Sequence, residues 1–443
     1  MKSKLGFQLL DYLSFHGVKP SVDNSLLSGS EEDWQRWLEL IDAAALTLHL
    51  LARLKERNDF ERLPISIRHR LEQTLRDNRI RLSQISEEFL EFNRLLQSEG
   101  ISYLNLKGLL LYPDFVDCLE HRVQYDHDFL VAKKDLHRAL QIFTDLGYTP
   151  LEPSGRMVID HLPTLVKKTG WTWKGNLYDP DIPRAVELHF RLWSPDFDLI
   201  SISSLDWIWE ESAQNDFQGF SVPSLSREHS LLYLLLHSFR HLLRSDLRLS
   251  HLYELSYFLH RFSQVRGFWD NFLLAASGCP QTLKAAALMF GLARHCFGGT
   301  LAPSLQTMME GHLSPACDLW IRRYGKGEAI HCYRRSKNAI FLHLDFVKSY
   351  ASRWILIWRK LIPRHLPLAS YGVQTPPQRQ NLRFRLRQRF YYLQQLLERL
   401  TFHLSSLLEL SIQFPIWHFR LQMHKKTSMR KTKFPFHKAR EIS

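Results

Sequence analysis

The stretch RVQYDHDFLV, residues 122–131, says most about the fold of this chain. Its last three residues are apolar and polar residues precede them, which is typical of a strand that runs into a hydrophobic core. Because successive side chains of a strand point to opposite faces, Asp126 and Asp128 share one face and His127 lies on the other. Two carboxylates about 7 Å apart along a strand can bind a hard divalent cation, which prefers oxygen ligands. The alternative interpretation is that the two aspartates are only the solvated edge of a strand.

A second strand pattern that carries a carboxylate is VELHFRL, residues 186–192. Its apolar residues share one face, and Glu187 and His189 lie on the other. If this strand is a neighbour of the first, Glu187 adds a third carboxylate to the two aspartates. The pattern therefore predicts three acidic side chains on one side of a sheet.

A lysine and a glycine follow a short strand pattern upstream, in LNLKGLL, residues 104–110. Gly108 is expected at a strand-to-helix turn, where backbone N–H groups are open and no side chain blocks an approaching ligand. Lys107 adds a cation beside them. This combination suits phosphate oxygens, although a glycine after a strand is more often a simple turn.

The periodicity changes twice along the chain, and these changes predict four regions. Long helical patterns come first, short strands mixed with helices follow, and helical patterns then return. We expect an N-terminal helical region (1–98), an α/β core (99–200), a helical domain (201–350) and a basic helical extension (351–443). The last twenty residues are predicted to be disordered because they are rich in basic and polar residues. The fold class is therefore α+β.

The composition is that of an ordinary globular protein, with 45% hydrophobic and 23% charged residues over 443 positions. The five cysteines form no CxxC pair and their number is odd, so neither a disulfide framework nor a zinc finger is indicated. No run of 18 apolar residues is present, which argues against a membrane span. We expect a cytoplasmic protein, with a peripheral position at the inner membrane as the alternative.

The net charge of +13 is concentrated at the C-terminal end of the sequence. Residues 353–443 contain 18 Lys and Arg against 3 Asp and Glu, a balance of +15, so the rest of the chain carries about −2. Such an asymmetry indicates an anionic partner, either nucleic acid or a membrane surface.

A regular apolar repeat lies inside this basic extension, at residues 386–407. Its members alternate spacings of four and three residues, which is the pattern of a coiled-coil seam. We call it the leucine stripe, and it consists of Leu386, Phe390, Leu393, Leu397, Leu400, Leu404 and Leu407. One interpretation is an arm that packs on the protein itself or on a second copy in a homo-oligomer. The other is a basic amphipathic surface for nucleic acid or anionic lipid.

Four short motifs occur in a fixed order along the chain: LKG (106–108), RVQYDHDFLV (122–131), DLGY (145–148) and VELHFRL (186–192). In this order and spacing they resemble the bacterial family of uncharacterised nucleotidyltransferases, whose fold is of the polymerase-β type. The resemblance covers roughly residues 30–370. It implies a small mixed-sheet nucleotidyltransferase core embedded in a largely helical protein.

The resemblance also implies roles for six residues. Asp126, Asp128 and Glu187 would be the catalytic residues and would bind Mg²⁺ or Mn²⁺, with Glu187 accepting the proton of an attacking hydroxyl. Lys107 and Gly108 would contact the phosphates of an NTP substrate. Arg122 would steady either the triphosphate or only the strand. The acceptor hydroxyl is not identified by any motif.

The sequence departs from the family pattern at His127, where an aliphatic residue is usual. A buried histidine needs a hydrogen-bond partner, so this residue favours an alternative function. In that alternative, the chain is a catalytically degenerate nucleotide-binding or scaffold protein whose basic extension binds nucleic acid or a membrane. His237 and His241 have a zinc-like i, i+4 spacing, but without an HExxH pattern we expect them to pack between helices or to lie at the rim of the active site.

Overall fold

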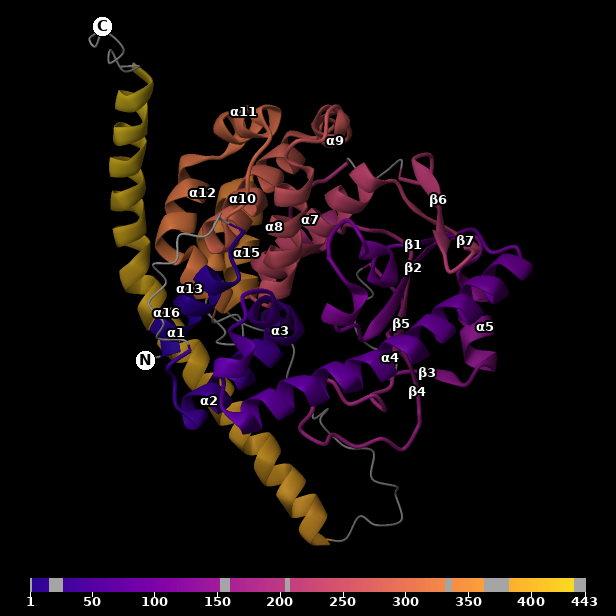
Figure 1. The fold of residues 1–443 in the computed structure, drawn as a ribbon. Coiled ribbons are helices and arrows are strands. Elements are labelled where there is room, and N and C mark those ends of the chain that lie inside the picture. Colours follow the sequence, from indigo (N-terminus) through magenta and orange to yellow (C-terminus); the bar gives the residue numbers. More distant parts are fainter. Residues whose placement is uncertain are drawn as a thin grey trace, which may run out of the picture.

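Seven strands between residues 103 and 225 form one mixed sheet, with the order β3-β4-β5-β2-β1-β7-β6. The computed structural model describes residues 2–15, 27–151, 160–203, 208–330, 337–361 and 382–433 (Figure 1). The strands are β1 (Tyr103–Asn105), β2 (Asp126–Val131), β3 (Tyr148–Pro150), β4 (Leu165–Lys167), β5 (Ala185–His189), β6 (Ser212–Phe217) and β7 (Phe220–Leu225). The predicted α+β class is confirmed.

Helices surround this sheet and make up most of the described chain. The N-terminal ones are α1 (Lys2–Tyr12), α2 (Glu31–Ala43), α3 (Thr47–Glu56), η1 (Phe60–Arg62) and α4 (Ile65–Ser98). Those within the sheet region are η2 (Gly108–Leu111), η3 (Leu119–His121), α5 (Leu136–Asp145) and α6 (Pro195–Asp198). The later ones are α7 (Arg227–Arg244), α8 (Leu249–Phe262), α9 (Phe268–Ser277), α10 (Pro280–Phe297), α11 (Pro303–His312), α12 (Pro315–Trp320), η4 (Ile321–Gly325), α13 (Lys326–Ile330), α14 (Ala339–Phe346), α15 (Tyr350–Leu361) and α16 (Leu382–Lys433).

The long helix α4 and the shorter α5 cover one face of the sheet (Figure 1). Alternate residues of β2 and β5 point into this layer, so Phe129 and Val186 are fully buried there. Phe143 of α5 packs edge-on to Phe92 of α4, with ring centroids 5.2 Å apart. This apolar layer fixes which residues of β2 and β5 point to the opposite face.

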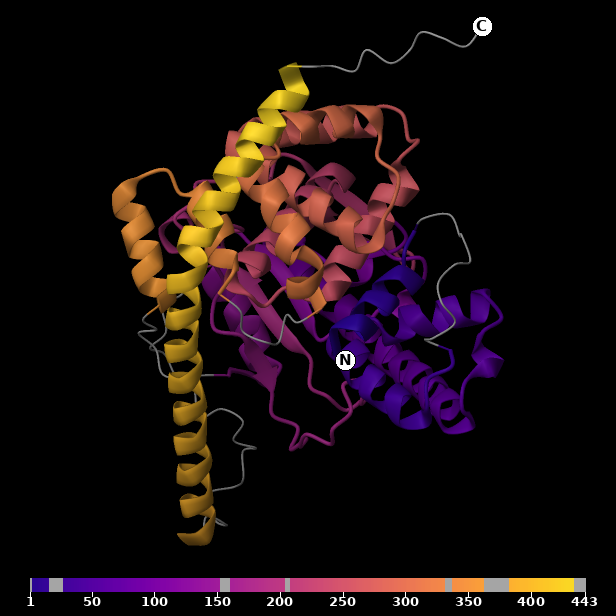
Figure 2. The same cartoon turned by 90° about the vertical axis from the view of Figure 1, so that its left-hand side faces the viewer.

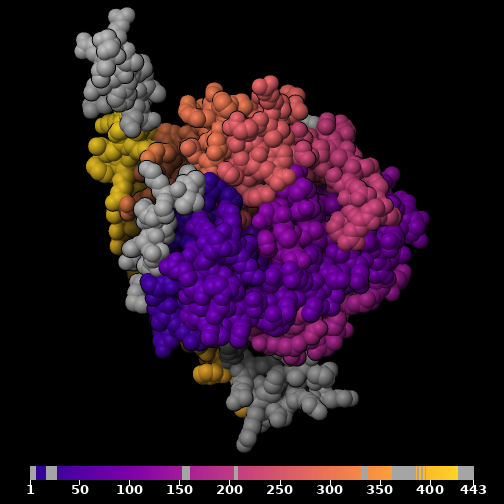
Figure 3. All heavy atoms as spheres, in the orientation of Figure 1, coloured from indigo at the N-terminus to yellow at the C-terminus, as the bar shows by residue number. Residues whose placement is uncertain are grey.

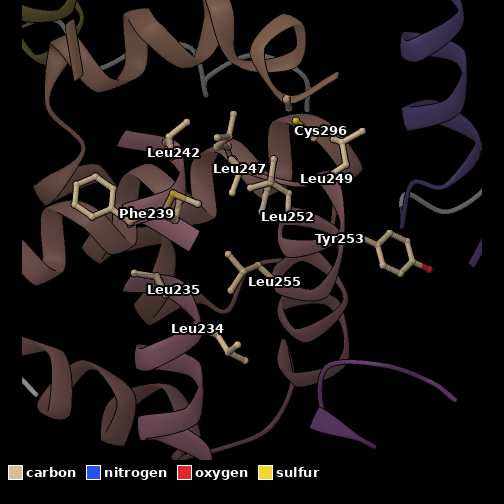
Figure 4. Packing of buried hydrophobic residues seen from close by; sticks show 14 of the residues in the cluster. Leu234, Leu235, Phe239, Leu242, Leu247, Leu249, Leu252, Tyr253, Leu255 and Cys296 are labelled. Carbon is tan, nitrogen blue, oxygen red and sulfur yellow. The ribbon is translucent and has the colours of Figure 1, made fainter. Parts of the chain in front are cut away.

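The opposite face looks toward the second helical layer, which begins with α7. Leucines of α7 and α8 interdigitate with residues of α10, as Figure 4 shows around Leu235, Leu252 and Cys296. Helix α7 begins at Ser226, whose hydroxyl accepts from the backbone N–H of His229 and so caps the helix. The candidate site lies on the side of the sheet that faces this layer.

The sheet extends beyond the predicted core, because residues 212–225 form the hairpin β6–β7. We expected helix to return after residue 201. Instead, β7 pairs in parallel with β1 through Asn105 and Ser224, and β6 follows at the edge. The hairpin strand Ser212–Phe217 is rich in polar residues and mostly exposed, so it lacks the apolar alternation that marks a strand in sequence.

The helix α16 lies along one edge of the molecule and extends past the body at its N-terminal end (Figure 2). Figure 3 shows it at the border of the face formed by the N-terminal helices. It docks through its C-terminal half, where Trp417 stacks on Phe341 of α14 with centroids 4.8 Å apart. His424 also lies 2.8 Å from Asp318 of α12.

The leucine stripe lies outside this docked surface. Its seven members are between 37% and 71% exposed, so in the described part of the chain the stripe does not pack on the protein's own body. That corrects the interpretation of an arm folded back along this seam. Residues 424–433 are helical rather than disordered, and the remaining residues of the predicted disordered tail lie outside the described part. No described helix is both long and apolar enough to span a membrane.

Candidate active site

Two of the three predicted carboxylates meet across neighbouring strands. β2 and β5 pair in parallel, with Asp128 directly opposite Glu187 and Asp126 opposite Ala185. Because directly opposed residues point to the same face of a sheet, Asp128 and Glu187 share the face away from α4. The side chain of Asp128 is only 1% exposed, whereas that of Asp126, at the start of the strand, is 35% exposed. The site thus has a buried floor and an open rim.

Lys107 holds the two aspartates together. Its Nζ lies 3.2 Å from Oδ2 of Asp128 and 3.6 Å from Oδ2 of Asp126. Burial alone would lower the pKa of this lysine, but the two carboxylates outweigh burial and raise it. A positive charge therefore occupies the point on which the aspartates converge.

His189 joins this group from the strand that carries Glu187. Its Nε2 lies 3.4 Å from Oδ1 of Asp128 and 3.6 Å from Oε2 of Glu187. Burial would lower the pKa of His189, but hydrogen bonds to both carboxylates raise it to about 9. Burial would raise the pKa of Glu187, yet the contact with His189 lowers it to about 2. Two cationic side chains, Lys107 and His189, therefore neutralise much of the acidic charge.

The donor atoms in this group are arranged as a metal would need. One ligand atom each from Asp128, Glu187 and His189 lie within 4.8 Å of one another. Oδ2 of Asp128 is buried and has no hydrogen bond in the described structure, only the ion pair with Lys107. Carboxylate oxygens are the ligands that Mg²⁺ and Mn²⁺ prefer, so Asp128 and Glu187 fit the predicted cation, whereas the imidazole of His189 is a ligand better suited to Zn²⁺. Asp126 lies outside this tightest group.

Gly108 has the conformation that its place in the motif requires. Its φ is +81°, a value that residues with a side chain rarely adopt, and it opens the short helix η2. A Cβ at this position would lie 2.5 Å from Nε2 of Gln124. That Nε2 donates to the backbone oxygen of Asp126 at 2.8 Å. The glycine therefore allows the Lys107 turn to pack against the segment that leads into β2.

His127 has the partner that a buried histidine needs. It points to the α4 side of the sheet, where its Nε2 lies 3.2 Å from Oε2 of Glu88. Its ring also packs edge-on to Phe92 at 5.0 Å. Arg184 donates to both oxygens of the same Glu88 at 2.6 Å. The departure from the family pattern is thus accommodated on the face opposite the carboxylates.

Arg122 is paired with a residue of the helical domain. Its Nε donates to Oε1 of Glu254 in α8 at 2.8 Å, and its side chain is 17% exposed. This contact ties the segment before β2 to the helical layer, which agrees with a role in steadying the strand. A role in binding the triphosphate stays a prediction.

Two features of the site were not given a role from sequence. His189 was placed on the correct face by strand alternation, but its contact with Asp128 depends on which strand lies beside β5. Thr164, just before β4, donates to Oε1 of Glu187 at 3.2 Å. His189 is itself part of the VELH motif, whereas no sequence motif marks Thr164.

His237 and His241 lie on α7 and contact each other, with their Nε2 atoms 3.1 Å apart. Nδ1 of His241 lies 3.0 Å from Oδ1 of Asp246, and Nδ1 of His237 accepts from Nη2 of Arg240 at 3.4 Å. Each Nδ1 therefore has its own partner and the two Nε2 atoms contact each other, so all four ring nitrogens take part in hydrogen bonds. These histidines agree with the predicted packing role and need no zinc.

The chain is an α+β protein. Its opposed carboxylates on adjacent parallel strands, beside a lysine-glycine turn, form a candidate site for metal-dependent group transfer. The family model described as "Uncharacterised nucleotidyltransferase" matches residues 30–298. The match spans the whole sheet and ends with α10, and the chain belongs to this family. No curated protein and no solved structure matches the chain, so the polymerase-β type of the fold stays a prediction.

Proposed function

We propose that the protein is a metal-dependent nucleotidyltransferase that moves a nucleoside monophosphate from an NTP to a hydroxyl acceptor. One observation supports this most: Asp128 and Glu187 lie directly opposite each other on parallel strands. The ammonium group of Lys107 lies between Asp128 and Asp126. Family membership supports the reaction class. The identity of the acceptor and of the base is left open by this arrangement.

In the proposed reaction, an acceptor oxygen forms a bond to the α-phosphorus of the NTP. The bond between that phosphorus and the oxygen that bridges to the β-phosphate breaks, and pyrophosphate leaves. Glu187, whose pKa is lowered to about 2, is ionised at neutral pH and would take the proton of the hydroxyl. Mg²⁺ or Mn²⁺, bound by Asp126, Asp128 and Glu187, would neutralise phosphate charge. Lys107 would then turn from the carboxylates to the phosphates, beside Gly108.

The decisive experiment is a labelling assay. Purified protein is incubated with Mg²⁺, each α-³²P-labelled NTP in turn, and a cell lysate as the source of acceptor. We expect label on one class of molecule with the wild type and none with Asp128→Asn. Equal labelling by the two proteins would contradict the proposal.

The second candidate function is a catalytically degenerate nucleotide-binding or scaffold protein. Its support in the sequence was His127, and the partner found in Glu88 weakens that support. Thermal shifts with NTPs separate the two functions. A shift that requires Mg²⁺ and is abolished by Asp126→Ala favours the enzyme, whereas a shift that is indifferent to Mg²⁺ favours the binding protein.

We also propose that α16 binds an anionic lipid surface. The leucine stripe is exposed, and residues 382–433 contain eleven Lys and Arg against two Glu. A second copy would bring two strongly basic helices together, and nucleic acid offers no apolar phase for leucines. An anionic bilayer surface offers both negative charge and an apolar interior. Exposed Trp354 and Trp358 of α15 add the aromatic residues that are frequent at membrane interfaces.

A further inference from the structure

We propose that His49, Asp117 and His121 form a zinc site, separate from the candidate active site. One ligand atom from each residue lies within 4.8 Å of the other two. The three residues belong neither to the four short sequence motifs nor to the carboxylate group on β2 and β5. Their chemistry also differs, because two imidazoles and one carboxylate replace a set of oxygens.

The three side chains come from two segments that pack against each other. His49 lies in α3, whereas Asp117 and His121 lie four residues apart in the segment that contains η3. Nδ1 of His121 is 3.2 Å from Oδ1 of Asp117, and the ring centroids of His49 and His121 are 6.2 Å apart. The arrangement depends on the fold, because His49 is far from the other two in sequence.

The exposed fraction of the side chains increases from His49 to His121 to Asp117, so an ion could reach the site from solvent. His49 is 2% exposed, His121 has a side chain that is 23% exposed, and that of Asp117 is 49% exposed. The ring of His49 packs on that of Tyr253, with centroids 4.5 Å apart. A metal would join this buried imidazole to the accessible carboxylate of Asp117, whose oxygen lies within 4.8 Å of it.

Zinc is the cation that these donors favour. It binds histidine nitrogens and carboxylate oxygens at about 2.0–2.2 Å in a tetrahedral geometry, so bound ligand atoms are about 3.3 Å apart. Small rotations of Asp117 and His121 would bring the three atoms to that spacing, and solvent would supply the fourth ligand. Mg²⁺ disfavours imidazole ligands and is not expected here.

The alternative is that Asp117 and His121 form only a local ion pair and that His49 is a packing residue. The charges nearby do not exclude a cation, because the two adjacent arginines are already neutralised. Arg53 lies 2.7 Å from Glu56, and Arg122 lies 2.8 Å from Glu254. The position of one carboxylate oxygen within 4.8 Å of nitrogens from two histidines of different segments favours the metal.

A metal at this point would stabilise the entry to β2. Asn78 of α4 donates to the backbone oxygens of Glu120 and Arg122, on either side of His121. Zinc would add a link from the same segment to α3. It would thus cross-link the N-terminal helices to the segment that leads to Asp126, without touching the reacting groups.

Metal content tests the proposal directly. Because Asp128, Glu187 and His189 can also bind zinc, all proteins carry Glu187→Gln as a common background. Each full-length protein is stripped with a chelator, incubated with Zn²⁺ in excess Mg²⁺, dialysed and analysed by mass spectrometry for zinc. The test variants add His121→Gln or Asp117→Asn. The matched control adds His137→Gln, since His137 is an exposed histidine of α5.

We expect about one zinc per chain in the background protein and in the His137→Gln control. His121→Gln and Asp117→Asn are expected to weaken zinc binding by roughly tenfold or more. Mutating a residue that only hydrogen-bonds to a metal ligand already lowers metal affinity by about that factor, and removing the ligand itself should lower it at least as much. Absence of zinc from the background protein would overturn the proposal, as would its retention in both test variants. Circular dichroism verifies that each variant is folded, and Asp117→Asn, at an exposed position, keeps the test valid if another variant unfolds.

Discussion

Glu187 lies directly opposite Asp128 on the neighbouring parallel strand, and His189 contacts both carboxylates. The pairing is fixed by the backbone ladder rather than by side-chain rotamers, so the two carboxylates stay adjacent when ligands change. A site built on two central strands is also held more precisely than one built on loops. The predictions for the candidate active site start from this pair.

Replacing either member of the pair should abolish metal-dependent activity. Asp128→Asn removes the charged oxygens from the buried floor of the site, and Glu187→Gln removes the proton acceptor while keeping the shape. Loss of a general base costs about 10²–10⁴-fold in rate. We expect both variants to lose Mg²⁺-dependent NTP labelling by at least about 100-fold. Glu91→Gln, at an exposed position on α4, serves as the control and should keep full activity.

Removing Lys107 should make the stability of the protein depend on metal. Lys107→Met removes one of the two cationic partners of the buried Asp128 and leaves only His189 beside it, and breaking a buried ion pair costs up to about 3–5 kcal/mol. Mg²⁺ can replace the missing charge, so its addition should raise the Tm of this variant more than that of the wild type. Thermal unfolding with and without Mg²⁺ measures the effect, with the exposed Lys134→Met as control. Equal Mg²⁺ responses in all three proteins would contradict a cation site between the aspartates.

The faces of the two key strands could be predicted from sequence, because side chains alternate in every strand. Asp126 and Asp128 were therefore placed together, and Glu187 with His189. The register was not predictable, since nothing local in residues 126–131 or 185–189 says which residue faces which. The contact between Lys107 and Asp128 depends on the sheet order, which is a tertiary property.

The leucine stripe shows the opposite limit of sequence analysis. Its spacing correctly predicted a helix with one apolar face. Whether the stripe is covered was not predictable, because the same pattern suits a packed arm, a second copy or a lipid surface. Docking of α16 through Trp417 and Phe414 lies C-terminal to the stripe, and of these two residues only Phe414 continues the heptad spacing from Leu407.

Replacing His127 by the aliphatic residue leucine should leave the candidate site intact. In His127→Leu, Glu88 keeps its two hydrogen bonds from Arg184, and the new side chain packs against Phe92. We expect a change of less than about 1.5 kcal/mol in the free energy of unfolding. Mg²⁺-dependent NTP binding, measured by calorimetry, should be unchanged. A loss of binding would mean that His127 helps to position the carboxylates on the opposite face of β2, which would contradict this prediction.

The stability of the protein should fall in acid partly through Glu88. Burial would raise the pKa of Glu88, but hydrogen bonds from His127 and Arg184 lower it to about 2 from its usual 4.5. A carboxyl whose pKa is lowered by folding stabilises the protein above its unfolded pKa. That contribution, about 3 kcal/mol, is lost as the pH falls from about 4.5 to 2. Glu88→Gln should show a shallower loss over this window in urea unfolding, whereas Glu91→Gln should follow the wild type.

The exposed leucine stripe should bind vesicles that carry negative charge. Leu397 and Leu404 are 56% and 54% exposed, so replacing both with Glu removes apolar surface and adds negative charge without opening the core. We expect the wild type to float with phosphatidylglycerol-containing vesicles and to bind phosphatidylcholine vesicles much less. Binding should weaken with added salt, because charges at the surface are screened within about 10 Å at 0.1 M.

Three measurements decide which partner covers the leucine stripe: vesicle binding, light scattering and oligonucleotide binding. The double variant Leu397→Glu and Leu404→Glu should lose vesicle binding, while Leu274→Glu, at a 74% exposed leucine of α9, should retain it. Light scattering tests the second copy: a dimer that the double variant dissociates would replace the lipid surface as partner. Binding of an RNA or DNA oligonucleotide that survives the double variant would assign the basic residues, rather than the leucines, to nucleic acid. Because the stripe is apolar and the helix basic, only the lipid surface should need both features at once.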